Sequence, residues 1–350
     1  MLDRSKTEHF SKRRKKGRSA FGGVWTTKYT FNDIIGESPE IKRVKILASK
    51  VSQTSATILL TGESGTGKEL FAHSIHQASP RKDKPFVWVE CSSIPKELLQ
   101  SELFGYESGS FTDADKDGKI GKFEVANQGT VFLDEIADMP IEMQAEILRV
   151  LQEKEVIRIG GVQPKKVDFR VIAATNRDIE RLVREDRFRN DLFYRLDVIR
   201  IHIPPLRERR DDISILIRHY LNFFCKKYNR PLIHFGLDAQ KSLERYSWPG
   251  NVRELVNVIE NLVICNDGNA PITTKDIPEE ISRGLYTYSK DSATDLKESI
   301  VQMKATIYKM ERDMIVEALR KTNNNKIKAA KLLGIHRSGL YQKLKKYGID

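Results

Sequence analysis

The sequence predicts an α/β protein in which a mainly parallel sheet is wrapped by helices and followed by two smaller helical parts. Two observations support this fold class. Short apolar runs rich in β-branched residues alternate with polar or helix-periodic sequence as far as residue 203. After Pro204 and Pro205 the apolar residues recur only at helical spacing. Because parallel strands need long crossover connections, usually helices, the alternation is typical of a parallel sheet with helices on its faces.

The elements follow in chain order. The expected strands are residues 56–61, 86–90, 130–134, 169–174 and 198–203. The helical segments after them are expected at residues 211–229, 238–246 and 251–265. The chain therefore divides into a basic segment expected to be disordered, an α/β subdomain, a helical subdomain, a polar linker and an all-helical domain, at residues 1–30, 31–206, 207–283, 284–304 and 305–350.

Composition excludes several classes of protein. The chain has 350 residues, of which 39% are hydrophobic and 31% charged, which is typical of a globular protein. Its three cysteines, Cys91, Cys225 and Cys265, are widely spaced and odd in number, so we expect no disulfide framework, no structural metal site and a cytoplasmic location. No run approaches the roughly 18 apolar residues of a membrane helix, so membrane insertion is not expected.

The net charge of +12 is unevenly distributed. Residues 1–30 carry +7 and residues 291–350 carry +6, which leaves −1 for the residues between them. A neutral body with two basic ends indicates that a polyanion is bound at the ends. About thirty residues cannot bury a core, so no sensor or receiver domain is expected before residue 31. Regulation then comes from a separate protein, or the chain is the terminal part of a longer one.

A phosphate-binding motif of the form G-x-x-x-x-G-K directly follows the first expected strand and opens a helix. Its residues are Gly62, Glu63, Ser64, Gly65, Thr66, Gly67, Lys68 and Glu69. Backbone N–H groups of such a loop surround phosphate oxygens, and Lys68 is expected to reach the β- and γ-phosphates. Glu69 stands where the general motif has Ser or Thr for Mg²⁺, and a carboxylate can hold that ion directly or through water. The alternative is a Gly-rich turn, which the strand-loop-helix context disfavours.

Acidic residues at the end of the third expected strand complete the motif. Asp134 is expected to bind Mg²⁺, and Glu135 to orient and polarise the attacking water. Asn176, after the fourth strand, is placed to hydrogen-bond the same water or the γ-phosphate. A solvated acidic turn is the alternative interpretation of Asp134 and Glu135 alone.

Eight motifs in this order resemble the AAA+ module of sigma-54-dependent transcriptional activators, the bacterial enhancer-binding proteins. They are GESGTGKE at 62–69, SELFG at 101–105, GSFTDA at 109–114, GTVFLDEI at 129–136, LRVLQE at 148–153, AATNR at 173–177, PPLRERRDDI at 204–213 and WPGNVREL at 248–255. The resemblance implies an AAA+ P-loop core with a five-stranded, mainly parallel sheet and a helical lid. It also implies an ATPase, using ATP and Mg²⁺, that forms a ring, usually hexameric, and remodels closed complexes of sigma-54 RNA polymerase into open ones.

The resemblance assigns roles to further residues. Arg189 and Arg195 match the arginine-finger segment that reaches the nucleotide of a neighbouring subunit. Arg253 matches the lid arginine that senses nucleotide. Ile35 and Gly36 match the stretch that lines the adenine pocket.

The GSFTDA motif resembles the family loop that contacts sigma-54. Phe111 and Thr112, the implied contacts, are intact, whereas Ser110 replaces Ala and Asp113 replaces Gly. Glu90 is another departure, because many family members carry Asn there to hold the catalytic Glu. Taken without the resemblance, the loop would be interpreted as an ordinary surface loop.

The C-terminal residues predict two short helices, 327–333 and 337–347, joined by a Gly-containing turn, which resemble the Fis-type helix-turn-helix of these activators. The second helix carries groups able to contact phosphates and base edges in a major groove: Arg337, Ser338, Tyr341, Gln342, Lys345 and Lys346. The longer helix before them, residues 307–319, offers an apolar stripe for pairing two copies. Dimeric binding to a two-fold site in upstream promoter DNA is therefore expected.

Two alternatives remain open on sequence grounds. The chain could be a DNA-binding regulator of the same fold that no longer engages sigma-54, because its GSFTDA loop is altered. It could also be a different AAA+ remodeller, such as a replication loader, which needs no loop like Phe111 and Thr112.

Overall fold

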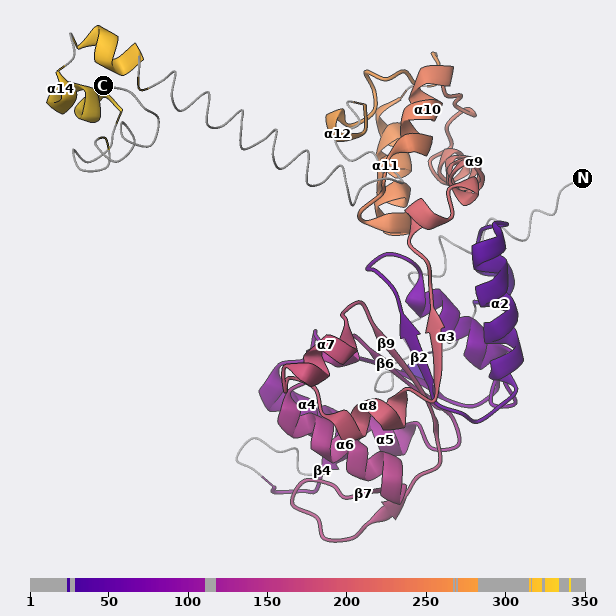
Figure 1. Cartoon of the computed structure of the whole chain (residues 1–350). Helices are drawn as coiled ribbons and strands as arrows, with labels where there is room; N and C mark the ends of the chain where they lie inside the picture. Colours follow the sequence, from indigo (N-terminus) through magenta and orange to yellow (C-terminus); the bar gives the residue numbers. More distant parts are fainter. Residues whose placement is uncertain are drawn as a thin grey trace, which may run out of the picture. The chain divides into compact units, whose positions relative to one another are not determined.

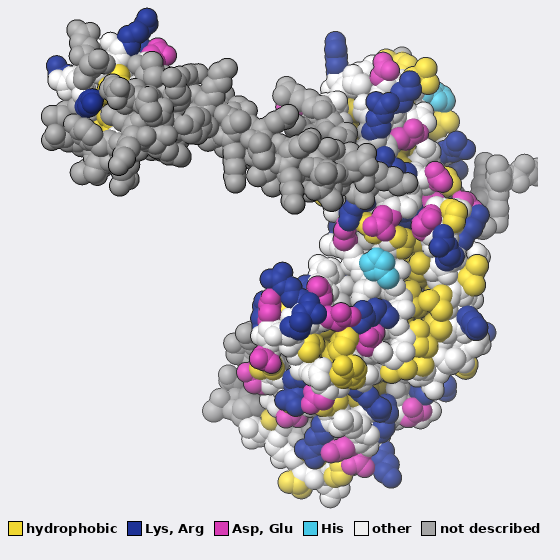
Figure 2. Space-filling view, viewed as in Figure 1, with side chains coloured by type: hydrophobic (Ala, Val, Ile, Leu, Met, Phe, Trp, Pro, Cys, Tyr) yellow, Lys and Arg dark blue, Asp and Glu magenta, His cyan; other side chains and the backbone are white. Residues whose placement is uncertain are grey.

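A computed structural model describes residues 24–25, 29–110, 118–266, 268, 270–282, 315, 317–322, 325–333 and 340. The chain forms two units, residues 1–287 and 288–350, and each is described by itself (Figure 1). The first unit contains an α/β part and a helical part. Its visible face carries acidic and basic side chains interspersed, with apolar side chains between them (Figure 2).

The α/β part is built on a six-stranded sheet with the order β1-β3-β6-β9-β2-β10. In chain order the strands are β1 (Val24–Trp25), β2 (Ile58–Thr61), β3 (Phe86–Glu90), β6 (Thr130–Asp134), β9 (Arg170–Thr175) and β10 (Ile199–His202). The five strands from β3 to β10 run parallel, which confirms the predicted five-stranded parallel sheet. β1 adds an antiparallel edge strand through Val24 and Trp25, within the segment that the sequence analysis expected to be disordered.

Helices cover both faces of this sheet (Figure 1). The α/β part contains α2 (Pro39–Ser52), α3 (Lys68–Gln77), α4 (Lys96–Phe104), α5 (Lys122–Val125), α6 (Ile141–Glu153), α7 (Ile179–Arg184) and α8 (Asn190–Leu196). Alternate residues of one strand face opposite ways, so Ile58 and Leu60 pack against α2 and α3 while Leu59 packs against the others. The α/β part also contains two small antiparallel strand pairs outside the main sheet. One joins β4 (Gly105–Tyr106) to β5 (Lys119–Ile120), and the other joins β7 (Glu155–Val156) to β8 (Lys165–Lys166).

A buried arginine ties the sheet to the end of α2. Arg170, the first residue of β9, is 2% exposed, and its guanidinium donates to the carbonyl oxygens of Ser52 and Val51 at 2.8 Å each and of Ala56 at 3.4 Å. Val51 and Ser52 are the last residues of α2, where carbonyl groups lack the i+4 partner of the helix interior, and Ala56 lies in the segment after it. Burial lowers the pKa of Arg170 to about 10, so the side chain remains a cation at neutral pH.

The helical part of the first unit is a separate apolar core. It consists of α9 (Asp211–Lys227), α10 (Leu237–Arg245), α11 (Asn251–Cys265) and α12 (Glu279–Ser282), close to the predicted segments. Trp248 is fully buried in this core, and its indole N–H donates to the carbonyl of Leu243 at 2.9 Å. A short 3-10 turn, η3 (Leu206–Glu208), connects it to the sheet.

The second unit is helical where it is described. Ile315 and residues 317–321 are helical, and α14 (Lys326–Leu332) follows. Ala329, Ala330 and Leu340 are buried in a small apolar core. The Asn325 side chain accepts a hydrogen bond from the N–H of Lys328 at 3.1 Å, so Asn325 caps the start of α14. In the described parts of both units, no helix is long and apolar enough to cross a membrane.

We predict that Arg170→Met lowers the free energy of unfolding of the first unit by about 3 kcal/mol, because the variant removes the buried guanidinium that donates to the carbonyl groups of Val51, Ser52 and Ala56. Chemical denaturation followed by circular dichroism measures the change. Arg184→Met, at an exposed position on α7, is the matched control and should shift stability by less than about 0.5 kcal/mol. Equal stabilities of the two variants would show that Arg170 does not hold α2.

Candidate nucleotide-binding site

The predicted phosphate loop joins β2 to α3. Gly65 and Gly67 have φ values of 79° and 106°, a backbone conformation that side chains with a Cβ rarely adopt. A loop of this kind turns its N–H groups toward one concave space at the start of a helix. Lys68 is 7% exposed, and its ammonium donates to the carbonyl oxygens of Gly62 at 2.9 Å and Glu63 at 3.3 Å. The lysine is therefore folded back along the loop that precedes it.

The two predicted acidic residues lie near this lysine at the end of β6, which β9 separates from β2 in the sheet. Asp134 ends β6, and Glu135 follows it in a left-handed conformation with φ 49°. One Glu135 oxygen lies 3.6 Å from the Lys68 ammonium, and the other accepts the backbone N–H of Asn176 at 3.0 Å. Because β2, β6 and β9 run parallel, their carboxyl ends bring these groups to one edge of the sheet.

The acidic pair is electrostatically unfavourable in the absence of a cation. Burial raises the pKa of Asp134 to about 6, and repulsion from Glu135 acts in the same direction, while Lys68 opposes both. Adjacent carboxylates held this close favour binding of a divalent cation with oxygen ligands. Glu69, in the first turn of α3, lines the same space with its side chain 48% exposed. Asp134 and Glu69 can therefore both reach a magnesium ion placed there.

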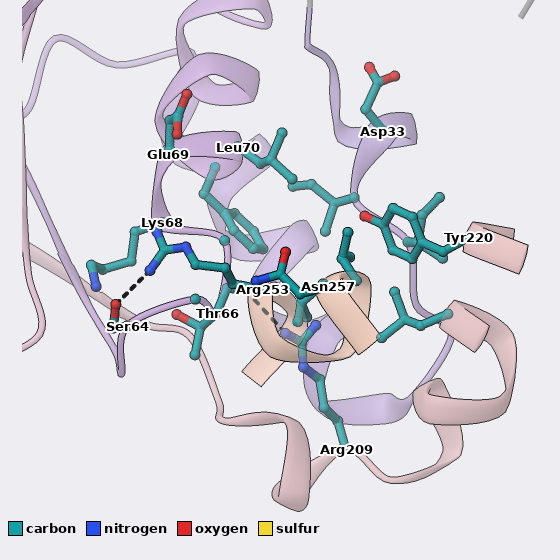
Figure 3. A pocket seen from close by; sticks show the side chains of 18 of the residues that line it. Asp33, Ser64, Thr66, Lys68, Glu69, Leu70, Arg209, Tyr220, Arg253 and Asn257 are labelled. Atoms are coloured by element: carbon teal, nitrogen blue, oxygen red, sulfur yellow. Dashed lines mark hydrogen bonds between the residues drawn. The ribbon is translucent and has the colours of Figure 1, made fainter. Parts of the chain in front are cut away.

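These groups line a cavity of about 300 Å³ between the loop and the helical part (Figure 3). Its polar wall consists of residues 64–69 with Asp134 and Glu135. Its apolar wall is formed by Ile34, Ile35, Leu216, Tyr220, Val252 and Val256. An apolar compartment beside a phosphate-binding loop fits a nucleotide, because the apolar wall suits the base and the polar wall suits the phosphates.

Two arginines enter the cavity from the helical part. The Arg253 guanidinium donates to the Ser64 hydroxyl at 2.8 Å (Figure 3). Arg209 is 2% exposed and donates to the carbonyl of Thr66 at 3.1 Å, whereas its Nε–H is buried without a hydrogen-bond partner. Burial lowers the pKa of Arg209. A buried donor without an acceptor is costly, so the site fits a ligand that carries acceptor oxygen or nitrogen atoms.

The structure places most, but not all, of the predicted nucleotide-binding residues at this cavity. Residues 64–69, Ile35 and Arg253 line it, whereas Gly62, Glu63 and Gly36 do not. Gly36 has a different function: with φ 145°, it leaves room for the carboxylate of Asp212, which a Cβ would approach to 2.7 Å. The Glu63 side chain is turned to the helical part, where Arg207 binds it.

Of the predicted catalytic residues outside the loop, Asn176 contacts the acidic pair, whereas Arg189 and Arg195 do not line the cavity. Asn176 reaches Glu135 through its backbone N–H. Arg189 is ion-paired with Asp191 at 2.7 Å, and Arg195 donates to the carbonyl of Leu151 at 3.0 Å; neither arginine lines the cavity of its own chain.

The remaining predicted contacts lie outside the described residues. These are the proposed sigma-54 contacts Phe111 and Thr112 and the proposed DNA contacts Arg337, Ser338, Tyr341, Gln342, Lys345 and Lys346.

Sequence reasoning missed ten residues that line the cavity, of which the polar ones include Arg209, Tyr220 and Asn257. Arg209 lies in a run of charged residues after Pro205, where spacing does not distinguish it from its neighbours. Tyr220 and Asn257 belong to amphipathic helices, and their position on the cavity side depends on how α9 and α11 meet the loop. The asparagine could have been recognised from its place one helical turn after Arg253.

Three family descriptions match consecutive parts of the chain. They are "Sigma-54 interaction domain" at residues 34–202, "AAA+ ATPase lid domain" at residues 207–294 and "Bacterial regulatory protein, Fis family" at residues 306–347. Regulatory protein AtoC of Escherichia coli is 44% identical over 93% of this chain and 70% of its own length. The chain belongs to the sigma-54-dependent transcriptional activators. As a member of that family it has an AAA+ P-loop NTPase core, a helical lid and a Fis-type helix-turn-helix domain.

Other relatives extend the comparison. A signal-transduction and transcriptional-control protein of Clostridium beijerinckii is 46% identical over 93% of this chain, which spans 50% of that relative. A crystal structure of NtrX from Brucella abortus in complex with ADP superposes with a TM-score of 0.67 at 34% identity, over 91% of this chain and 70% of NtrX. The α/β part and the lid of this activator thus have the arrangement of a family whose members include a nucleotide-bound structure.

We predict that Gly65→Ala weakens ADP binding by at least about tenfold, which corresponds to about 1.4 kcal/mol. A Cβ at this position would lie 2.3 Å from the carbonyl oxygen of Gly250, so the lid must move away from the loop. Titration with a fluorescent ADP analogue measures the affinity. Gly109→Ala is the control, because its φ of 72° is similar but a Cβ there meets nothing within 4 Å. Equal affinities of both variants and the parent chain would contradict the importance of this contact.

Proposed function

We propose that this activator hydrolyses ATP in a ring assembly and uses the hydrolysis to convert closed complexes of sigma-54 RNA polymerase into open complexes. The observation that supports the ATPase activity is the meeting of Lys68, Asp134 and Glu135 at one cavity, where a Glu135 oxygen lies 3.6 Å from the Lys68 ammonium. The family match at residues 34–202 supports the polymerase partner.

Each residue at the cavity has a distinct role in this proposal. Lys68 binds the β- and γ-phosphates once its ammonium leaves the loop carbonyls. Asp134 and Glu69 hold Mg²⁺, which would neutralise charge on the phosphate oxygens. Glu135 accepts a proton from the attacking water and keeps it in line with the γ-phosphate, with its carboxylate oriented by the N–H of Asn176. Arg253, on α11 of the lid, contacts the bound nucleotide, so the position of the lid depends on whether nucleotide is present.

The proposed arginine fingers complete the site only between subunits. Arg189 and Arg195 do not line their own cavity, so they are available to the γ-phosphate of a neighbouring copy. An arginine supplied in trans can raise the hydrolysis rate by about 10³ to 10⁵. Hydrolysis would therefore depend on assembly, from a DNA-bound dimer to a hexameric ring, under the control of a separate regulatory protein or of a further part of a longer chain. We place this activity in the bacterial cytoplasm.

We expect Lys68→Ala to abolish nucleotide binding and Glu135→Ala to preserve binding while lowering kcat by at least about a hundredfold, since only the second change removes the proton acceptor. Fluorescent-nucleotide titration and a phosphate-release assay separate the two effects. Normal turnover by Lys68→Ala would contradict the site, and undiminished turnover by Glu135→Ala would remove Glu135 from its role.

The coupling to sigma-54 is tested separately at the GSFTDA loop. Thr112→Ala should keep the ATPase rate and lose open-complex formation, measured by permanganate footprinting in a purified sigma-54 system. The altered residues Ser110 and Asp113 make a second function possible, that of a DNA-binding regulator that does not engage sigma-54. That function predicts no open complexes even with the unaltered chain, whereas unchanged activation by Thr112→Ala would count only against the loop assignment.

A further inference from the structure

The phosphate loop is attached to the lid at four successive residues. The Glu63 carboxylate accepts from Arg207 and from the Asn251 amide, the latter at 3.0 Å. The Ser64 carbonyl also accepts from Asn251, at 3.1 Å. The next two residues of the loop offer their carbonyls in the same way: Gly65 to the N–H of Val252 at 3.1 Å and Thr66 to Arg209 at 3.1 Å.

Asn251 is the centre of these contacts. It is fully buried, and its φ of 54° is a left-handed conformation that is uncommon outside glycine. Its amide oxygen accepts from the N–H of Leu206 at 2.7 Å, so its NH₂ group must point to the loop. The Asn251 amide thus joins the start of α11 both to the connection before α9 and to the phosphate loop.

Glu63 is the charged member of the contact. One of its oxygens accepts from Arg207 at 2.7 Å, and the other also binds that guanidinium, so the pairing is two-pronged. The hydrogen bonds from Arg207, and to a lesser extent from Asn251, hold the pKa of the Glu63 carboxyl below its usual value against the opposing effect of burial. The carboxylate therefore stays charged at neutral pH, and it does not line the nucleotide cavity.

We propose that Glu63 is a positioning residue: with Arg207 and Asn251 it forms a latch that holds the lid over the phosphate loop. The latch itself does not depend on the proposed ATPase function; only its expected effects on KM and kcat rest on that function. Arg253 lies two residues after Asn251 on α11, so the latch fixes the position of the Arg253 side chain in the cavity. There its guanidinium donates to the Ser64 hydroxyl at 2.8 Å. Releasing the latch lets α11 move away and separates Arg253 from the phosphates, without touching Lys68, Asp134 or Glu135.

The latch predicts a specific pattern in nucleotide binding. Glu63→Gln and Arg207→Gln should each raise the Kd for ADP and the KM for ATP by about tenfold, with kcat at saturating ATP within twofold, because lid closure contributes equally to ground-state and transition-state binding. The double variant should bind ADP as weakly as either single variant, since both break the same contact. Glu180→Gln is the matched control: its carboxylate also pairs with an arginine, Arg200, at 2.7 Å, but lies away from the cavity.

Hydrogen exchange tests the latch independently of catalysis. In the nucleotide-free protein, amides of residues 250–256 should exchange faster in Glu63→Gln than in the parent chain, because the Val252 N–H loses its hold on Gly65, and they should be unchanged in Glu180→Gln. Unchanged exchange would overturn the latch, and so would additive losses of ADP affinity in the double variant. A fall in kcat with unaltered KM would also overturn it, since that result places Glu63 at the reacting phosphates. A parent chain without ATPase activity would reject the proposed function and leave the exchange result as the test of the latch.

Discussion

The contact between the lid and the backbone of the phosphate loop is the constraint on which the site depends. A loop that turns its N–H groups toward phosphates must turn its carbonyl groups elsewhere, and buried carbonyls need donors. Here the lid supplies them: Asn251 to Ser64, Val252 to Gly65 and Arg209 to Thr66. The same contacts bring two lid arginines to the cavity, so loop geometry and lid position are parts of one hydrogen-bonded arrangement.

The net charge of the chain differs between residues 31–290 and the C-terminal residues. Acidic and basic side chains are interspersed over the visible face of the first unit (Figure 2), in agreement with the near-zero net charge of residues 31–290. The +6 of residues 291–350 coincides with the part that matches the Fis family, and DNA affinity that depends on such charge falls steeply with salt.

Much of the fold could be predicted because parallel buried strands leave a strong sequence pattern. The bounds of residues 86–90 and 130–134 were predicted without error, and the confirmed parallel sheet brings Asp134 and Glu135 to the phosphate loop. The predictions were less complete where tertiary contacts determine the position of a side chain. Arg209 reaches the cavity only because α9 begins beside Thr66, and Glu63 turns away from it only because Arg207 lies opposite. Val24 and Trp25 form an edge strand that two residues are too few to predict.

Glu90 shows how one departure from the family pattern changes the electrostatics of the site. It ends β3 directly opposite Asp134, at the position where the resemblance leads one to expect Asn. An amide there would donate to a neighbouring carboxylate, whereas the Glu90 carboxylate repels Asp134 and adds to the burial and to Glu135 in raising its pKa. The negative charge of Asp134 is therefore less favourable here than it would be beside an amide at position 90. The orientation of Glu135 then depends on the backbone N–H of Asn176 on β9's side of the sheet, and not on a side-chain amide from β3.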